Sequence, residues 1–417
     1  MKKMALLFPG QGSQYIGMAK KLSSDFEIVN RIFDEANNIL NFDLKKLCFE
    51  GSIEELTNTY NAQPAILTAS VAAYKVYMQE VGIKPDYLAG HSLGEFSALV
   101  CGEVLNFSDA LRLVRYRGKL MSEAGEYQKG VMAAIGDMDA ELVEEICREI
   151  SSDKNIVGVA CYNAPDQLVI SGHQDALNAA ISKIHLMGGR ATHLKVSMAF
   201  HSPLLISQAN KFEEELCNLS FKQNIYPIIS NVTGEPYKDK DDMLKNLKLQ
   251  MYKPVQWINS MKYLERNNVV LAVEVGPGTT LKKLAAKNIK HISAFSYDKL
   301  QDVKDMAKLI LPKNNDVEYS VVQKCISAAI TAPNNNFNGE DYDEGVIEPF
   351  KKIQELQLGL EQAALSPNVE QMEAALRMLK SVFITKNITL EEQKERFMQI
   401  LDETNTKNLF GEWIVEL

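Results

Sequence analysis

The chain has 417 residues, enough for two or three domains, and its 46% hydrophobic and 24% charged content is typical of a globular protein. The net charge of −9 does not favour nucleic-acid binding, and no apolar run approaches the ~20 residues of a membrane-spanning helix. The six cysteines lack CxxC or metal-ligand spacing, so we expect reduced structural thiols, no metal site and a cytoplasmic protein.

The charge is unevenly distributed along the chain. Residues 301–417 contain 12 lysines and arginines against 20 acidic residues, a net charge of −8, so residues 1–300 carry only −1. We therefore expect a nearly neutral body followed by a separate acidic extension.

The first predicted strand, Met4–Phe8, runs into the glycine-rich turn Pro9–Gln14. In open α/β sheets such turns line the ligand crevice. Helical periodicity follows over Met18–Leu40, and another helix is expected to begin at Gln63 and to end before Gly82.

The segment Gly90–Gly94 reads Gly-X-Ser-X-Gly, between a strand-like run and a helix-like run. Glycines on both sides of the serine allow the backbone to turn tightly, and a helix N-terminus offers N–H groups to an oxyanion. The pattern predicts a nucleophile elbow at Ser92, although the pentapeptide alone also suits an ordinary strand-to-helix turn.

Residues 130–197 show the order strand, helix, strand, strand, helix, strand, which is typical of a ferredoxin-like arrangement. We predict an α/β protein with an α/β-hydrolase-like main domain and a parallel sheet, formed by residues 1–129 and 198–298. The block 130–197 is then an inserted subdomain that forms one wall of a cleft, and residues 299–417 are a mainly helical extension.

The extension has helical periodicity over Val346–Leu365, Val369–Phe383 and Thr389–Glu403, and it carries no catalytic motif.

A serine hydroxyl needs a base within hydrogen-bond reach to become a nucleophile. Among six histidines, His201 is the best placed, because it follows a strand-to-loop junction where the chain returns to the main body. A single histidine is more often a structural imidazole, so position alone leaves its role open.

Nine short motifs occur in the order found in malonyl-CoA:acyl-carrier-protein transacylases and the related acyltransferases of polyketide synthases. The chain resembles this family over roughly residues 1–295. The motifs are Phe8–Gln14, Gln63–Ala65, Gly90–Glu95, Arg117-Gly118, Asn163–Gln167, Ala199–Ser202, Ser230–Gly234, Gln250 with Pro254–Trp257, and Glu274–Gly278.

The resemblance implies that Ser92 attacks the thioester of malonyl-CoA and becomes the acyl-enzyme. It implies that His201 takes the serine proton and later activates the phosphopantetheine thiol of an acyl carrier protein. The backbone carbonyl of Gln250 would orient this histidine, and the backbone N–H groups of Gln11 and Leu93 would form the oxyanion hole.

The same resemblance implies the substrate contacts. Arg117 would pair with the free malonyl carboxylate, held in place by Gln63 and with His91 beside that carboxylate. Phe200 would crowd an α-methyl group and disfavour methylmalonyl by ~1–3 kcal/mol, and Asn163 would support the pocket. No cofactor is implied beyond the two substrates.

The implied function is malonyl transfer to an acyl carrier protein in polyketide or fatty-acid biosynthesis. An acyl hydrolase that removes stalled acyl groups from carrier proteins shares the serine and histidine, but such relatives commonly lack the arginine. A lipase, an esterase or a non-catalytic scaffold leaves more motifs unexplained.

The acidic extension suggests a freestanding acyltransferase that serves an assembly line in trans. Residues 300–417 would then bind a partner protein or cover the body of the enzyme.

Overall fold

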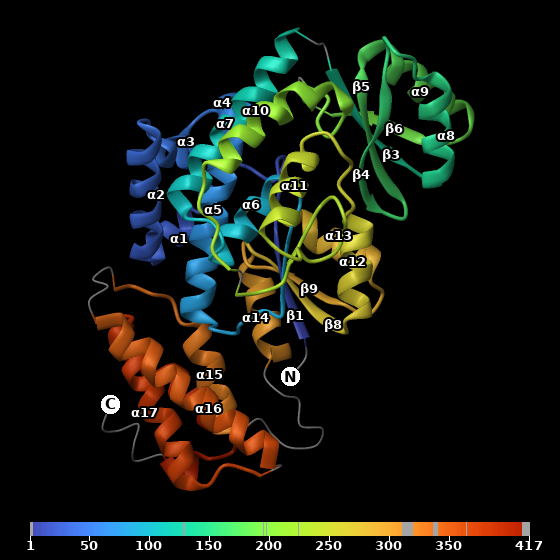
Figure 1. Cartoon of the computed structure of the whole chain (residues 1–417). Coiled ribbons are helices and arrows are strands. Elements are labelled where there is room, and N and C mark those ends of the chain that lie inside the picture. The colour runs from blue at the N-terminus through green and yellow to red at the C-terminus, as the bar shows by residue number, and fades with distance from the viewer. Residues whose placement is uncertain are drawn as a thin grey trace. The chain divides into compact units, whose positions relative to one another are not determined.

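The computed structural model describes residues 3–127, 130–194, 196, 198–223, 225–310, 320–336, 341–363 and 365–410 (Figure 1). They divide into two compact units. The first comprises Met1–Ala19, Ile32–Tyr74 and Pro85–Asp298, and the second comprises Lys20–Arg31, Lys75–Lys84 and Lys299–Leu417. The second unit therefore includes two N-terminal segments that the sequence pattern had placed in the main domain.

A five-stranded parallel sheet with the order β7-β2-β1-β8-β9 forms the centre of the first unit. Met4 to Phe8 of β1 are at most 1% exposed, as a central strand covered on both faces requires. The predicted α/β class with a parallel sheet is confirmed. The strands are β1 (Lys3–Phe8), β2 (Tyr87–Gly90), β7 (Ile228–Ile229), β8 (Val269–Glu274) and β9 (Ser293–Ser296).

Helices connect these strands. Outside the inserted segment, the helices that lie wholly within the first unit are α3 (Leu44–Glu50), α4 (Ile53–Thr57), α6 (Leu93–Cys101), α7 (Phe107–Tyr127), α10 (Ile206–Cys217), α11 (Lys240–Gln250), α12 (Trp257–Arg266) and α13 (Thr280–Asn288), with a 3₁₀ turn at Pro203–Leu205. Because β1 lies between β2 and β8, the turns that follow these three parallel strands meet at one edge of the sheet.

Two helices, α2 (Glu27–Leu40) and α5 (Thr59–Glu80), contribute residues to both units. The expected start of α5 at Gln63 is wrong: the helix begins four residues earlier, and Pro64 lies inside it. A hydrogen bond from Ala62 N to Asn58 O already closes a turn before the proline. The periodic stretch from Met18 to Leu40 is divided between α1 (Lys20–Asp25) and α2.

The inserted segment forms a separate antiparallel sheet with the order β4-β5-β3-β6. Counted along the segment this order is 2-3-1-4, the split βαβ arrangement. Its elements are β3 (Gly130–Gly136), α8 (Ala140–Ile150), β4 (Val157–Ala164), β5 (Gln167–His173), α9 (Gln174–Leu186) and β6 (Arg190–His193). Val255 joins this sheet to the main body, because its N–H and carbonyl bond to Ala160 O and Tyr162 N at 2.9 Å each.

The second unit is helical and has its own apolar core. Its further elements are α14 (Leu300–Ile310), α15 (Val321–Thr331), a π-helical turn at Asp343–Ile347, α16 (Glu348–Ala363), α17 (Val369–Thr385) and α18 (Leu390–Glu403). Helices α15 to α18 contribute fully buried side chains such as Val322, Leu379, Phe383 and Phe397 to one cluster. The three helices predicted in the extension are present, whereas α14 and α15 were not predicted. None of the helices formed by the described residues is apolar enough over enough length to cross a membrane.

A buried ion pair ties the end of α5 to the extension within this second unit. The Lys386 Nζ donates to Glu80 Oε2, and the Tyr342 hydroxyl donates to Glu80 Oε1. The side chains of Lys386 and Glu80 are only 1% and 4% exposed. The ammonium also donates to the carbonyls of Ala329 and Ala332, at 3.0 and 3.3 Å. The geometry gives both charges several hydrogen bonds, which a buried pair needs.

We expect Lys386→Met to destabilise the second unit by about 3–5 kcal/mol, because it leaves the Glu80 carboxylate buried without its cation. Hydrogen exchange of α15 and α17 amides should accelerate accordingly, and adding Glu80→Gln should restore part of the protection. Lys324→Met removes the more exposed pair with Glu403 and serves as the control. Equal exchange rates in Lys386→Met and Lys324→Met would show that the buried pair stabilises the second unit no more than the exposed pair does.

Candidate functional site

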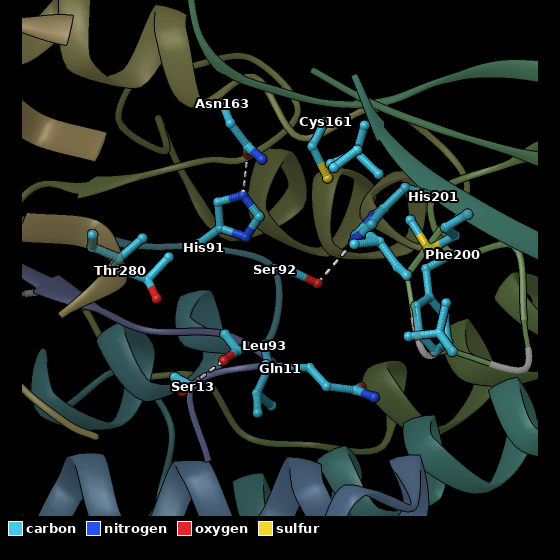
Figure 2. Close-up of a pocket in the computed structure, with 18 of the residues that line it drawn as sticks. Gln11, Ser13, His91, Ser92, Leu93, Cys161, Asn163, Phe200, His201 and Thr280 are labelled. Carbon is cyan, nitrogen blue, oxygen red and sulfur yellow. Dashed lines mark hydrogen bonds between the residues drawn. The ribbon is translucent and has the colours of Figure 1, made fainter. Parts of the chain in front are cut away.

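A pocket of about 430 Å³ lies in the first unit, between the turns at the edge of the main sheet and the small antiparallel sheet (Figure 2). Met132, Ala134 and Val169 of the small sheet line one side, so this sheet does form a wall of the cleft. Eight of the predicted site residues also line it: Gln11, His91, Ser92, Leu93, Arg117, Asn163, Phe200 and His201. The other two, Gln63 and Gln250, are 1% exposed and contact Arg117.

The turn between β2 and α6 has the close backbone approach that its two glycines permit. A Cβ on Gly90 would lie 2.0 Å from the carbonyl carbon of Gly94, and a Cβ on Gly94 would lie 1.9 Å from Phe8 O. Ser92 itself has φ 51° and ψ −106°, a strained conformation for a residue with a side chain. The strand-to-helix turn is therefore a sharp elbow that presents the Ser92 side chain to the pocket.

Ser92 and His201 lie within hydrogen-bond distance, as Figure 2 shows: Ser92 Oγ is 2.8 Å from His201 Nε2. The other ring nitrogen, Nδ1, is 2.7 Å from the backbone carbonyl oxygen of Gln250. A carbonyl can only accept, so Nδ1 carries the proton and Nε2 is the acceptor for the serine hydroxyl. Burial, followed by the positive charge of Arg117, lowers the pKa of His201 to about 3, so the imidazole is neutral at physiological pH.

Arg117 on α7 is the buried cation of the site, with only 2% of its surface exposed. Its Nη1 donates to Gln63 Oε1 at 3.0 Å, and its Nη2 donates to Gln250 Oε1 at 2.9 Å and to Ser92 Oγ at 3.3 Å. The Nε–H has no acceptor among the described residues. Burial lowers the pKa of the guanidinium to about 9, so it stays charged at neutral pH and retains donor capacity for an anion.

His91 lies across the elbow from the serine and points toward the small sheet (Figure 2). Its Nε2 is 2.8 Å from Asn163 Oδ1, and its ring lies 5.4 Å from that of Trp257. Burial lowers the pKa of His91, so it is a neutral hydrogen-bonding group. Phe200 precedes the His201 loop and is 9% exposed, with its carbonyl accepting from Ser171 Oγ at 2.8 Å.

Gln11 and Leu93 begin the two turns that meet beside Ser92. The turn after β1 lies directly against the elbow, since a Cβ on Gly10 would be 2.4 Å from His91 O. Neither the Gln11 nor the Leu93 N–H has a hydrogen-bond acceptor within the part of the chain that the structure describes. Two unfilled backbone donors beside a serine are what an oxyanion hole requires.

Three residues that received no role from the sequence surround this arrangement. Glu95, Asn231 and Tyr237 are 1%, 1% and 7% exposed, and the Asn231 N–H and the Tyr237 hydroxyl both donate to the Glu95 carboxylate. The side chain of Gln250 was also missed, since only its carbonyl was assigned. Glu95 and Asn231 do stand inside two of the quoted motifs, so their positions in the motifs were the available signal.

The comparison with known sequences agrees with this geometry. The acyl transferase domain family matches residues 5–313. A malonyl CoA-acyl carrier protein transacylase from Bacillus subtilis is 41% identical over 395 residues, which cover 94% of this chain and 99% of that protein. The protein of the same name from Escherichia coli strain K12 is 40% identical over 295 residues, 70% of this chain and 95% of its own length. The match to the Bacillus subtilis relative thus extends into the acidic extension of this chain.

Solved structures show the same likeness. FabD from Acinetobacter baumannii has a TM-score of 0.71 and 37% identity, covering 74% of this chain and 98% of that one. A malonyl-transacylase solved in complex with its type II polyketide synthase acyl-carrier protein has a TM-score of 0.68 and 36% identity, over 70% of this chain and 95% of that one.

We expect Gly90→Ala to abolish the elbow, because the new Cβ would meet backbone at 2.0 Å and cannot be relieved by a rotamer change. The melting temperature of the first unit should fall by several degrees, and Ser92 should lose its reactivity. Gly158→Ala in β4 is the matched control, since a Cβ there meets nothing within 4 Å. A Gly90→Ala protein that melts like the control would show that the turn tolerates a side chain.

Proposed function

The chain belongs to the acyl transferase family of malonyl CoA-acyl carrier protein transacylases, and we propose from this premise that it moves a malonyl group between two thiols. The malonyl group leaves malonyl-CoA, forms an ester on Ser92, and passes to the phosphopantetheine thiol of an acyl carrier protein. The Bacillus subtilis and Escherichia coli relatives are both malonyl CoA-acyl carrier protein transacylases, and the pocket has the chemical groups that the reaction needs.

The contact between Arg117 and Ser92 is the observation that favours malonyl as the acyl group. Arg117 Nη2 lies 3.3 Å from Ser92 Oγ, inside a buried site. In a malonyl thioester the carboxylate is one carbon away from the carbonyl that the serine attacks. A carboxylate paired with Arg117 therefore holds that carbonyl beside Ser92 Oγ, whereas a simple acyl chain would leave the buried guanidinium without its anion.

The proton moves along the contact between Ser92 and His201. As Oγ attacks the thioester carbonyl, its proton passes to Nε2, and the imidazolium is stabilised by the bond from Nδ1–H to Gln250 O. The tetrahedral oxyanion accepts from the N–H groups of Gln11 and Leu93. Collapse expels the CoA thiolate, which takes the proton from Nε2. The carrier-protein thiol then repeats these steps in reverse order.

Substrate binding also raises the lowered pKa of His201. Burial is the largest cause of its lowered pKa, and Arg117 is the next, because a nearby positive charge disfavours the imidazolium. When the malonyl carboxylate neutralises Arg117, that repulsion falls and the pKa of His201 rises. The base is therefore strongest when the correct substrate is bound.

Phe200 and Asn163 complete the proposed substrate contacts. Phe200 narrows the pocket beside His201 and disfavours an α-methyl group by ~1–3 kcal/mol. Asn163 holds His91 beside the site of the malonyl carboxylate. Nucleophile, base and carboxylate ligand all come from the chain, so the chemistry requires no cofactor beyond the two substrates.

The proposed setting is a cytoplasmic polyketide or fatty-acid pathway. All six cysteines are unpaired with one another, which suits a reducing compartment. The acidic extension, which the 395-residue match to the Bacillus subtilis relative reaches, favours a freestanding enzyme that acts in trans. Since α15 to α18 form a separate core, the extension can present a docking surface for a partner protein.

Intact-protein mass spectrometry tests the proposal. The protein is mixed with malonyl-CoA, then with a holo acyl carrier protein, with Ser92→Ala as the control. We expect a malonyl adduct on the wild type alone, which then moves to the carrier protein. An adduct that is lost as free acid while the carrier stays unmodified would support an acyl hydrolase instead.

We expect Arg117→Met to lower kcat/KM for malonyl-CoA by about 10- to 150-fold, as the loss of a hydrogen-bonded charge of ~1.5–3 kcal/mol implies. Acylation by acetyl-CoA should fall much less, because that substrate has no carboxylate to pair. Arg112→Met on the same helix is the control, since its side chain is 62% exposed. Equal losses with both substrates would rule out carboxylate recognition by Arg117.

A further inference from the structure

Glu95 stands three residues after Ser92, the spacing at which serine and glutamate commonly cap a helix N-terminus reciprocally. Neither side chain makes the capping bond here. The Ser92 side chain makes no cap hydrogen bond and contacts His201 instead. The Ser92 N–H, which the glutamate would accept from in a capping box, donates to Asn231 Oδ1 at 2.6 Å. The Glu95 carboxylate is therefore available for other contacts.

The carboxylate of Glu95 accepts on both oxygens. Oε1 accepts from the Asn231 N–H at 3.1 Å and from the Tyr237 hydroxyl. Oε2 accepts from Gln250 Nε2 at 2.6 Å. All of these partners are donors, so the site around Glu95 is built for an acceptor on each side.

Gln250 connects this carboxylate to the reacting groups. Its Nε2 also donates to the Ser92 carbonyl at 2.9 Å, while its Oε1 accepts from Arg117 Nη2 at 2.9 Å. A reversed amide would put its NH₂ group against the guanidinium and its oxygen against the Glu95 carboxylate. Both contacts would be repulsive, so the negative charge of Glu95 selects the amide orientation that serves Arg117.

We propose that Glu95 is a positioning residue that orients the Gln250 amide, and through it the Arg117 guanidinium, so that the enzyme selects acyl groups carrying a carboxylate. This inference rests on the proposed malonyl transfer. It differs from carboxylate binding by Arg117 itself, because Glu95 hydrogen-bonds to Gln250 and influences the guanidinium through its charge.

The position of Glu95 also suits the charge of the site. A second negative group on the guanidinium itself would compete with the substrate carboxylate. With the Gln250 amide between them, Glu95 supplies a counter-charge for the buried Arg117 and leaves the arginine available to a ligand.

The test is Glu95→Gln, which keeps the shape and removes the charge. The side-chain amide of a glutamine has one oxygen, which accepts, and one NH₂ group, which donates. Its NH₂ group must therefore face another donor, either Gln250 Nε2 or the Asn231 N–H. The rates of Ser92 acylation by malonyl-CoA and by acetyl-CoA are measured in single turnovers. We expect the malonyl-to-acetyl ratio to fall about tenfold or more, the effect of one misplaced charge-assisted hydrogen bond.

Glu144→Gln is the matched control, because the Glu144 carboxylate also accepts from a tyrosine hydroxyl, that of Tyr162 at 2.7 Å, and Glu144 is not among the residues that line the pocket. A purely structural role for Glu95 would lower both acylation rates equally, and an unchanged ratio would overturn the proposal. A wild-type protein that is not acylated by malonyl-CoA would instead refute the proposed function.

Gln250→Met supplies a second route if Glu95→Gln folds poorly. It keeps the carbonyl that accepts from His201 but removes the amide, so the malonyl-to-acetyl ratio should fall as it does in Glu95→Gln. In the double variant the two effects should not add, since both act through the same amide. Additive losses would show that Glu95 acts by another path and would overturn the inference.

The pH dependence gives a further readout. Burial raises the pKa of Glu95 to about 7, against the opposing hydrogen bonds from Tyr237 and Gln250 and the charge of Arg117. The other titratable groups around it are Arg117, with a pKa lowered to about 9, Tyr237, with a pKa raised well above its usual value, and His201, with a pKa lowered to about 3.

None of those neighbours has a pKa near 7 in the free enzyme. A pH dependence that comes from His201 would persist in Glu95→Gln, so the difference between the wild type and this variant reports on Glu95. In the wild type the malonyl-to-acetyl ratio should fall as the pH drops through about 7, because a protonated Glu95 no longer holds the amide. Glu95→Gln should have a low ratio that does not change over this range. A wild-type ratio that is constant with pH, together with an unchanged ratio in Glu95→Gln, would refute the assignment.

Discussion

Gln250 makes the interactions on which the arrangement of the pocket depends. Its carbonyl holds the His201 ring, its amide oxygen holds Arg117, and its amide nitrogen bonds to the carbonyl of the Ser92 elbow. These partners come from α7, from the turn after β2 and from the loop before α10. Because Gln250 contacts the nucleophile, the base and the cation through its backbone and its side chain, a small movement of Gln250 displaces all three.

The elbow imposes a second, steric constraint. The backbone of Gly94 passes so close to Phe8 and Gly90 that no side chain fits on either glycine. This contact brings the turn after β1 against the N-terminus of α6, and it places two unfilled N–H groups beside Ser92. The electrostatic environment adds to the geometry, because burial and then the positive charge of Arg117 lower the pKa of His201.

The second unit is organised differently. Its polar anchor, Lys386 with Glu80, joins the last turn of α5 to the helices of the extension. A buried ion pair is stable only when its other polar atoms also have hydrogen-bond partners. The carbonyls of Ala329 and Ala332 accept from the Lys386 ammonium and so meet this need. The 395-residue match to the Bacillus subtilis relative covers 94% of this chain and therefore includes part of the extension.

The amino-acid sequence by itself determined the features that short-range patterns encode. Alternating and continuous apolar runs predicted the parallel sheet and the three helices of the extension, and glycine spacing predicted the elbow at Ser92. The family motifs supplied His201, Arg117 and Gln250. Their approach within hydrogen-bond distance was decided by the tertiary structure, since they are far apart in the chain.

Other contacts could not be predicted from short-range patterns. The side-chain role of Gln250, the contacts of Glu95 and the pairing of Glu80 with Lys386 each join residues separated by more than 100 positions. Burial of such groups, and hence their altered pKa values, depends on what covers them and not on their neighbours in sequence. The physical reason is that hydrogen-bond partners and solvent exclusion are properties of the packed molecule.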